Sequence, residues 1–95
     1  MSDNISLSDV NLPNLDSLKQ LAVSESGFVF DPTSGYSFSV NEIGLQILKR
    51  LQQEMPPDEI LQELLDHYHV SLREAERDVI EYIGLLRQQL EGVPS

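Results

Sequence analysis

Histidine and serine side chains are the residues in this sequence whose types could support metal or nucleophilic chemistry. His67 and His69 lie two positions apart near a predicted helix end, and side chains two apart do not share a helix face. They make a poor metal pair, and the negative end of the helix dipole favours a solvated position for both. Ser26, Ser37 and Ser39 have no Gly-x-Ser-x-Gly context, and each suits a turn, a strand or a helix cap.

Other catalytic signals are missing from the sequence. It contains no cysteine and no glycine-rich phosphate loop, which excludes thiolate metal sites, cysteine nucleophiles and phosphate binding by such a loop. The acidic residues are spread over the predicted solvent faces, so no carboxylate pair for acid–base catalysis can be named. We therefore expect no catalytic residue, no metal and no cofactor, and we rank an enzyme last among the function classes.

Three of the six basic residues fall on one strip of the last predicted helix. At about 100° per residue, that strip consists of Arg73, Arg77, Ile80, Gly84 and Arg87. A glycine at position 84 would let another backbone approach closely, although glycine inside a helix costs about 1 kcal/mol relative to alanine. We interpret the strip as a binding surface. In the alternative interpretation, the arginines pair with Glu74, Glu76 or Glu81 along the helix surface.

A second candidate surface is the segment Tyr36, Ser37, Phe38 and Ser39, which alternates apolar with polar residues. Such alternation is typical of a half-buried strand. If this strand lies at a sheet edge, its backbone groups form a template to which an extended peptide can add. The alternative is a protected edge with no ligand, and the sequence does not identify the edge strand.

The elements that would position these surfaces are three strands and three helices. Leu18, Leu21 and Val23 indicate a weak first strand, and Phe28 to Phe30 a second. A turn over residues 31–35, with proline early and glycine last, connects the second strand to the third strand at 36–40. Two runs joined by a five-residue turn that contains glycine predict a β-hairpin.

The helices follow from capping signals and apolar spacing. Ser39 to Glu42 and Ser71 to Glu74 each fit a capping box that opens a helix. Pro57 suits the first position of the helix between them. Gly92 and Pro94 would close the last one. The predicted apolar stripe of that last helix is Leu72, Ala75, Val79, Ile83, Leu86 and Leu90.

Length and charge limit the possible classes. The 95 residues suffice for one domain, which we place at residues 17–92, after a flexible N-terminal arm at 1–16. The formal net charge of −10 disfavours nucleic acid and anionic membranes as partners. No apolar run approaches the ~20 residues that span a bilayer. We expect a cytoplasmic protein, either a monomer or a weak dimer.

The segments from Leu21 to Pro32 and from Gly35 to Asn41 resemble the PqqD-like proteins, as do the stretches 41–48 and 75–83. The similarity runs from about Leu18 to Leu90. It is strongest to small stand-alone peptide chaperones that are encoded beside an HPr-kinase-like protein. The resemblance implies an α+β, winged helix-turn-helix-like fold, with a three-stranded antiparallel sheet followed by three helices.

The resemblance also implies a function, which is recognition of ribosomally made, post-translationally modified peptides. In such proteins a leader peptide adds antiparallel to the third strand, against the third helix. Carried to this sequence, the strand is Tyr36 to Ser39, and the helix wall would include Arg73, Arg77, Ile80 and Gly84. The flank with Asp78, Tyr82 and Leu85 is the alternative wall. The implied partners are a precursor peptide and a separate maturation enzyme, such as a radical-SAM or HPr-kinase-like protein.

Two other functions are compatible with the sequence. Three helices with a hairpin can also build a winged helix-turn-helix transcription factor, although the charge of −10 disfavours that function. The domain could also be an interaction subunit that binds a kinase-like or maturation protein without any peptide client.

Overall fold

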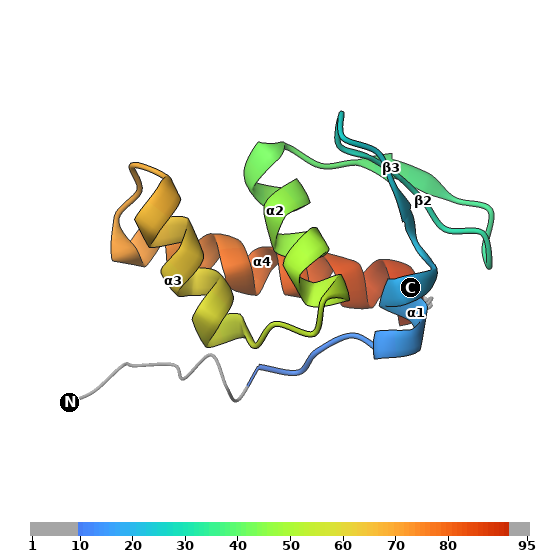
Figure 1. Cartoon of the computed structure of the whole chain (residues 1–95). Coiled ribbons are helices and arrows are strands. Elements are labelled where there is room, and N and C mark those ends of the chain that lie inside the picture. Colours follow the sequence, from blue (N-terminus) through green and yellow to red (C-terminus); the bar gives the residue numbers. More distant parts are fainter. Residues whose placement is uncertain (1–9, 92–95) are drawn as a thin grey trace.

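The structure, a computed structural model, describes residues 10–91. The elements in order are α1 (Leu15–Gln20), β1 (Ala22–Val23), β2 (Phe28–Phe30), β3 (Ser37–Ser39), α2 (Glu42–Gln52), α3 (Pro57–His67) and α4 (Leu72–Glu91). Figure 1 shows the three long helices packed together, with the small sheet near the C-terminal half of α4. The predicted α+β fold, an antiparallel three-stranded sheet followed by three helices, is confirmed.

The helix α1 was not predicted, and the expected first strand is correspondingly shorter. Leu18, which we expected in that strand, lies in α1 with only 2 % of its surface exposed. The side chain of Asn14 caps the helix by accepting a hydrogen bond from the N–H of Ser17 at 3.1 Å, which stabilises the first turn. The predicted boundary between arm and domain, after residue 16, falls inside α1. Residues 1–9 of the predicted arm lie outside the described residues.

The strands pair in the order β1-β2-β3, and both pairs are antiparallel. The turn between β2 and β3 has the predicted chemistry. Gly35 adopts a φ of 82°, and the Asp31 carboxylate accepts hydrogen bonds from the Thr33 N–H at 3.0 Å and the Ser34 hydroxyl at 2.9 Å. The predicted hairpin is therefore confirmed, with strand bounds slightly shorter than expected.

The N-cap of helix α2 lies two residues later than we predicted. Its N-cap is Asn41, whose side chain accepts a hydrogen bond from the Gly44 N–H at 2.8 Å. Ser39, the predicted cap, belongs to β3. Asparagine is as good an N-cap as serine, and extended pairing with β2 occupies the backbone up to Ser39.

The other two helix starts agree with the prediction. Pro57 is the first residue of α3. At the start of α4, the Glu74 N–H donates to the Ser71 hydroxyl at 3.1 Å, and the Ser71 N–H donates to the Glu74 carboxylate at 3.3 Å. These reciprocal bonds are those of a capping box. Gly92 and Pro94, the predicted end of α4, lie outside the described residues.

The core lies between the sheet and the three long helices. Its most completely buried large side chains are Val29, Ile47, Leu48, Ile60, Val79, Ile83 and Leu86. Each contributes about 1.5–3 kcal/mol relative to an exposed position. Leu72, predicted in the apolar stripe of α4, is instead 53 % exposed, because it is the first residue of the helix and precedes the turn that packs on the core. No helix within residues 10–91 is long and apolar enough to cross a membrane.

Candidate functional site

Strand β3 is an edge strand, because it is the last in the order β1-β2-β3 and pairs with β2 alone among the described strands. The opposite edge, β1, has two residues. The candidate segment Tyr36 to Ser39 therefore lies where an added strand could pair. Phe38 is half-buried on the side of the helices, and Ser37 and Ser39 are exposed.

The hydrogen-bond pattern of the hairpin shows which backbone groups of β3 are directed outward. The Val40 N–H donates to the Gly27 carbonyl at 2.8 Å, and the Asp31 N–H donates to the Tyr36 carbonyl at 2.8 Å. Hydrogen-bonded and non-hydrogen-bonded pairs alternate in an antiparallel ladder. The N–H and C=O groups of Ser37 and Ser39, which occupy the alternate positions, therefore point away from β2.

Asn41 and Tyr82 connect the end of this edge to α4. Asn41 lies two residues after β3, and its side-chain oxygen accepts a hydrogen bond from the Tyr82 hydroxyl at 2.8 Å. A Cβ atom added to Gly44 would collide with the Tyr82 ring, so the ring lies against the first turn of α2. The flank of α4 that carries Tyr82 therefore faces the β3–α2 junction.

Further along α4, the same flank lies near Tyr36, the residue that precedes β3. Tyr36 lines a cavity of about 140 Å³ together with Gln89 and Leu90 of α4. The seven steps from Tyr82 to Gln89 span about 10 Å of helix, and the four steps from Tyr36 to Val40 span about 13 Å of strand. The α4 flank thus runs beside the β3 edge. Leu85, 52 % exposed, lies on this flank between Tyr82 and Gln89.

The arginine strip is not brought to β3. Ile80 lies about 200° around α4 from Tyr82, so the strip that contains Ile80 faces away from the flank beside β3. Arg73 and Arg77 are exposed, and neither forms an ion pair with any residue of the described part of the chain. The alternative interpretation, in which the arginines pair with glutamates along the helix, is therefore not observed for these two. That the strip forms the peptide wall stays a prediction.

Gly84 has open space around it. A Cβ atom at this position would meet no atom within 4 Å, and a shallow hollow lies over it between Glu81, Leu85 and Gln88. Packing within residues 10–91 therefore gives no reason for a glycine here.

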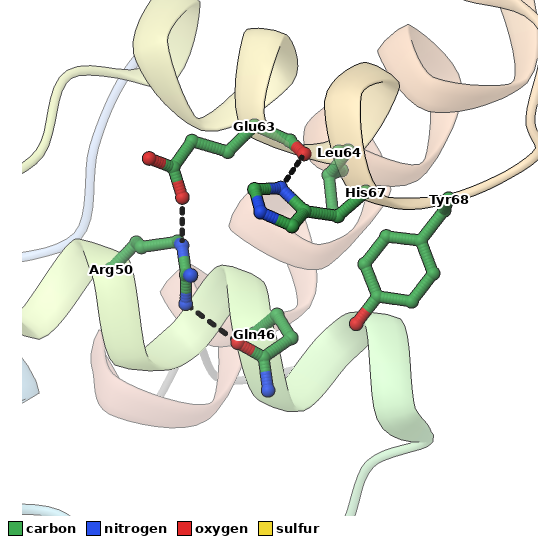
Figure 2. Close-up of a pocket in the computed structure, with 6 residues that line it drawn as sticks. All are labelled: Gln46, Arg50, Glu63, Leu64, His67 and Tyr68. Carbon is green, nitrogen blue, oxygen red and sulfur yellow. Dashed lines mark hydrogen bonds and ion pairs between the residues drawn. The ribbon is translucent and has the colours of Figure 1, made fainter.

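A polar pocket between α2 and α3 was not predicted from the sequence (Figure 2). The Arg50 Nε donates to the Glu63 carboxylate at 2.8 Å, and another guanidinium N–H donates to the Gln46 side-chain oxygen at 2.6 Å. The Nδ1 of His67 lies 2.9 Å from the Glu63 carbonyl oxygen. Because a carbonyl only accepts, this nitrogen carries the proton, which leaves Nε2 as the acceptor in the neutral ring. Gln46 and Arg50 are four residues apart on α2, and Glu63 and His67 are four apart on α3. No local spacing indicates that the two pairs meet, because they lie on different helices.

Tyr68 completes the polar lining of this pocket. Partial burial, followed by the nearby Glu42 carboxylate, raises the pKa of Tyr68 above its ordinary value, while Arg50 acts in the opposite direction. The residues lining the pocket include no serine, threonine, cysteine or lysine nucleophile. Within residues 10–91 no three histidine or acidic side chains are grouped so that they could hold a metal ion.

Residues 27–89 match the family model described as coenzyme PQQ synthesis protein D (PqqD). The chain belongs to the PqqD family. The match begins just before β2 and includes β3, α2, α3 and nearly all of α4. The match therefore includes the edge strand β3 and the flank of α4 that lies beside it.

A solved structure resembles this PqqD-family chain over most of its length. It is "Lasso peptide synthetase B1 complexed with the leader peptide", with a TM-score of 0.64 and 27 % sequence identity. The alignment covers 74 % of this chain and 84 % of the synthetase chain. No curated protein matches the chain at a significant level. The resemblance found from the sequence is thus confirmed at the level of family and fold.

Proposed function

We propose that this PqqD-family domain binds the leader segment of a ribosomally made precursor peptide as an added strand on β3. The observation that carries the proposal is the exposed edge formed by the outward N–H and C=O groups of Ser37 and Ser39. The related synthetase structure, which is complexed with a leader peptide, supports a peptide as the ligand. An unblocked edge without such a use would be an aggregation hazard for a soluble domain.

The α4 flank with Tyr82, Leu85 and Gln89 is the second wall of the proposed groove. Main-chain hydrogen bonds contribute about 0.5–1.5 kcal/mol each, and they do not distinguish one peptide sequence from another. Selectivity therefore requires side-chain contacts. The peptide residue opposite Phe38 points to the same side of the sheet as Phe38, towards α4. We expect this residue to be apolar, because Leu85 and the Tyr82 ring are its neighbours.

The proposed contribution to maturation is delivery, without bond chemistry by this domain. A peptide held by the domain is presented to a separate maturation enzyme at a raised effective concentration. A radical-SAM or HPr-kinase-like protein is the type of enzyme that the family resemblance suggests. The domain itself would act as a non-catalytic peptide chaperone.

A proline substitution tests strand addition directly. In Ser39→Pro the lost N–H is one that points away from β2, and proline is tolerated at such edge positions. Binding would be measured by fluorescence anisotropy with a panel of labelled synthetic peptides from short reading frames beside the gene. We expect Ser39→Pro to abolish binding and Ser39→Ala, which keeps the N–H, to retain it. Equal binding by a folded Ser39→Pro variant would contradict addition at this edge.

A further inference from the structure

The outer face of the sheet, directed away from the helices, carries two exposed aromatic side chains. Phe28 is 51 % and Phe30 is 42 % exposed, whereas Val29 between them is completely buried. This alternation is that of a strand with one face on the core. None of the residues of β1, β2 or β3 is charged, in a chain of which 23 % is charged. An uncharged face with exposed aromatic rings is typical of a contact surface.

The neighbours of these two rings are small. Phe28 is paired with Ser39, and Phe30 is paired with Ser37 on one side and Ala22 on the other. No large side chain of β3 therefore stands between the rings and the open edge of the sheet. Because serine side chains are short, each phenylalanine ring has open space on the side of β3.

We infer that Phe28 and Phe30 bind the outward-facing side chains of the peptide, and that these are apolar residues two positions apart. This inference rests on the proposed function, because it needs a strand added to β3. Peptide residues opposite Ser37 and Ser39 point to the same face as those serines. They lie in register with Phe30 and Phe28, respectively.

The distances permit this contact. Neighbouring strands lie about 4.8 Å apart, so the added strand is about 9.6 Å from β2. A phenylalanine ring that leans over serine, and a leucine or methionine side chain that extends from the peptide, can meet across this gap. The preferred peptide segment then has three consecutive apolar residues, the middle one facing α4 and the outer two facing the phenylalanines.

The peptide fits this face better than a second copy of the chain does. Three strands of two or three residues offer a footprint on the order of 100 Å², whereas a stable interface needs about 800 Å² per partner. The face becomes larger only when a strand adds beside β3. The bound peptide supplies that strand and is continuous with the proposed binding edge.

The test combines protein and peptide substitutions, with the tightest-binding peptide of the panel as the probe. Phe28→Thr/Phe30→Thr removes both rings and retains residues that favour strands. Leu72→Thr is the control, since Leu72 is an apolar residue that is 53 % exposed but lies at the start of α4, away from the sheet. We expect the double variant to weaken binding by about tenfold, and the control to leave it unchanged. Alanine at either outer peptide position should weaken binding to the wild type and have no effect in the double variant.

The outcomes separate this inference from the proposed function. Tight binding that is lost in Ser39→Pro but is equal in the wild type and the double variant would overturn the inference and leave the edge site intact. A self-association of the wild type that the double variant loses, with peptide binding unchanged, would assign the face to a second copy and also overturn it. If no panel peptide binds the wild type, the proposed function and the inference fail together.

Discussion

The aromatic ring of Tyr82 lies against Gly44, and its hydroxyl donates a hydrogen bond to Asn41 at 2.8 Å. This contact joins α4 to the first turn of α2, directly after the edge strand β3. The oxygen of Asn41 accepts from both the Gly44 N–H and the Tyr82 hydroxyl. The position of the α4 flank beside β3 therefore depends on a glycine that allows the two helices to approach.

Replacement of this glycine should be costly. In Gly44→Ala the new methyl group collides with the Tyr82 ring, and overpacking of this kind costs about 1–3 kcal/mol of unfolding free energy. Gly84→Ala is the matched control, since its methyl group meets no atom within 4 Å, and it should stabilise the domain by about 1 kcal/mol. Urea denaturation measures both variants. A stabilised Gly44→Ala protein would show that Tyr82 does not pack on this turn.

The two flanks of α4 can be compared by adding one negative charge on each. We expect Leu85→Glu, on the flank beside β3, to weaken peptide binding at least about tenfold, because it introduces a charge into an apolar contact. Arg77→Glu, on the opposite strip, should leave affinity within about twofold, as is usual for an exposed charge away from the contact. Anisotropy titrations of folded variants measure both effects. The reverse order would make the arginine strip the peptide wall, as the sequence first suggested.

Tyr68 should make stability depend on alkaline pH. Its pKa is raised in the folded protein by partial burial and by Glu42, so the folded state retains the phenolic proton to higher pH than the unfolded chain does. The resulting stabilisation is complete below the unfolded pKa of about 10 and is lost as pH rises through the higher folded pKa. Denaturation midpoints between pH 9 and 11 for the wild type and Tyr68→Phe measure this difference. Identical profiles would contradict the raised pKa.

Loss of the capping box should weaken the start of α4. Ser71→Ala removes the hydroxyl that accepts from the Glu74 N–H, and such caps contribute about 1 kcal/mol. Thermal unfolding followed by circular dichroism measures the loss. Ser71→Asp, which supplies another capping oxygen, should restore most of the stability. An unchanged melting temperature in Ser71→Ala would show that this cap is not significant in solution.

Much of the fold could be predicted because its signals are local. Alternation around Phe38, the turn that ends at Gly35 and the capping box at Ser71 each need only a few consecutive residues. Helix α1 was missed because Leu18, Leu21 and Val23 were interpreted as a strand. The spacing of Leu15, Leu18 and Leu21, three residues apart, also fits a helix. The Asn14 cap was the available signal.

The binding site could be predicted only in part, for a physical reason. The alternation of apolar and polar residues predicts strand β3 itself. Its position at the edge depends on the order of the strands in the sheet, which local alternation does not give. The helix wall depends on how α4 is rotated against the sheet. That rotation depends on the contacts of Tyr82 with Asn41 and Gly44, which are distant in sequence. A helical wheel identifies two flanks of α4 and cannot select between them. The charge of the arginine strip favoured one flank, and the packing favours the other.

The most direct test of peptide binding at the β3 edge is an NMR titration of isotope-labelled protein with the panel of synthetic peptides. We expect a binding peptide to shift the amides of Ser37, Phe38 and Ser39, together with those from Asp78 to Gln89 on α4. The amides of Ser37 and Ser39 should also become protected from hydrogen exchange, since their N–H groups would pair with the peptide. Binding that shifts only other surfaces, or a panel in which no peptide moves these amides, would contradict recognition by strand addition.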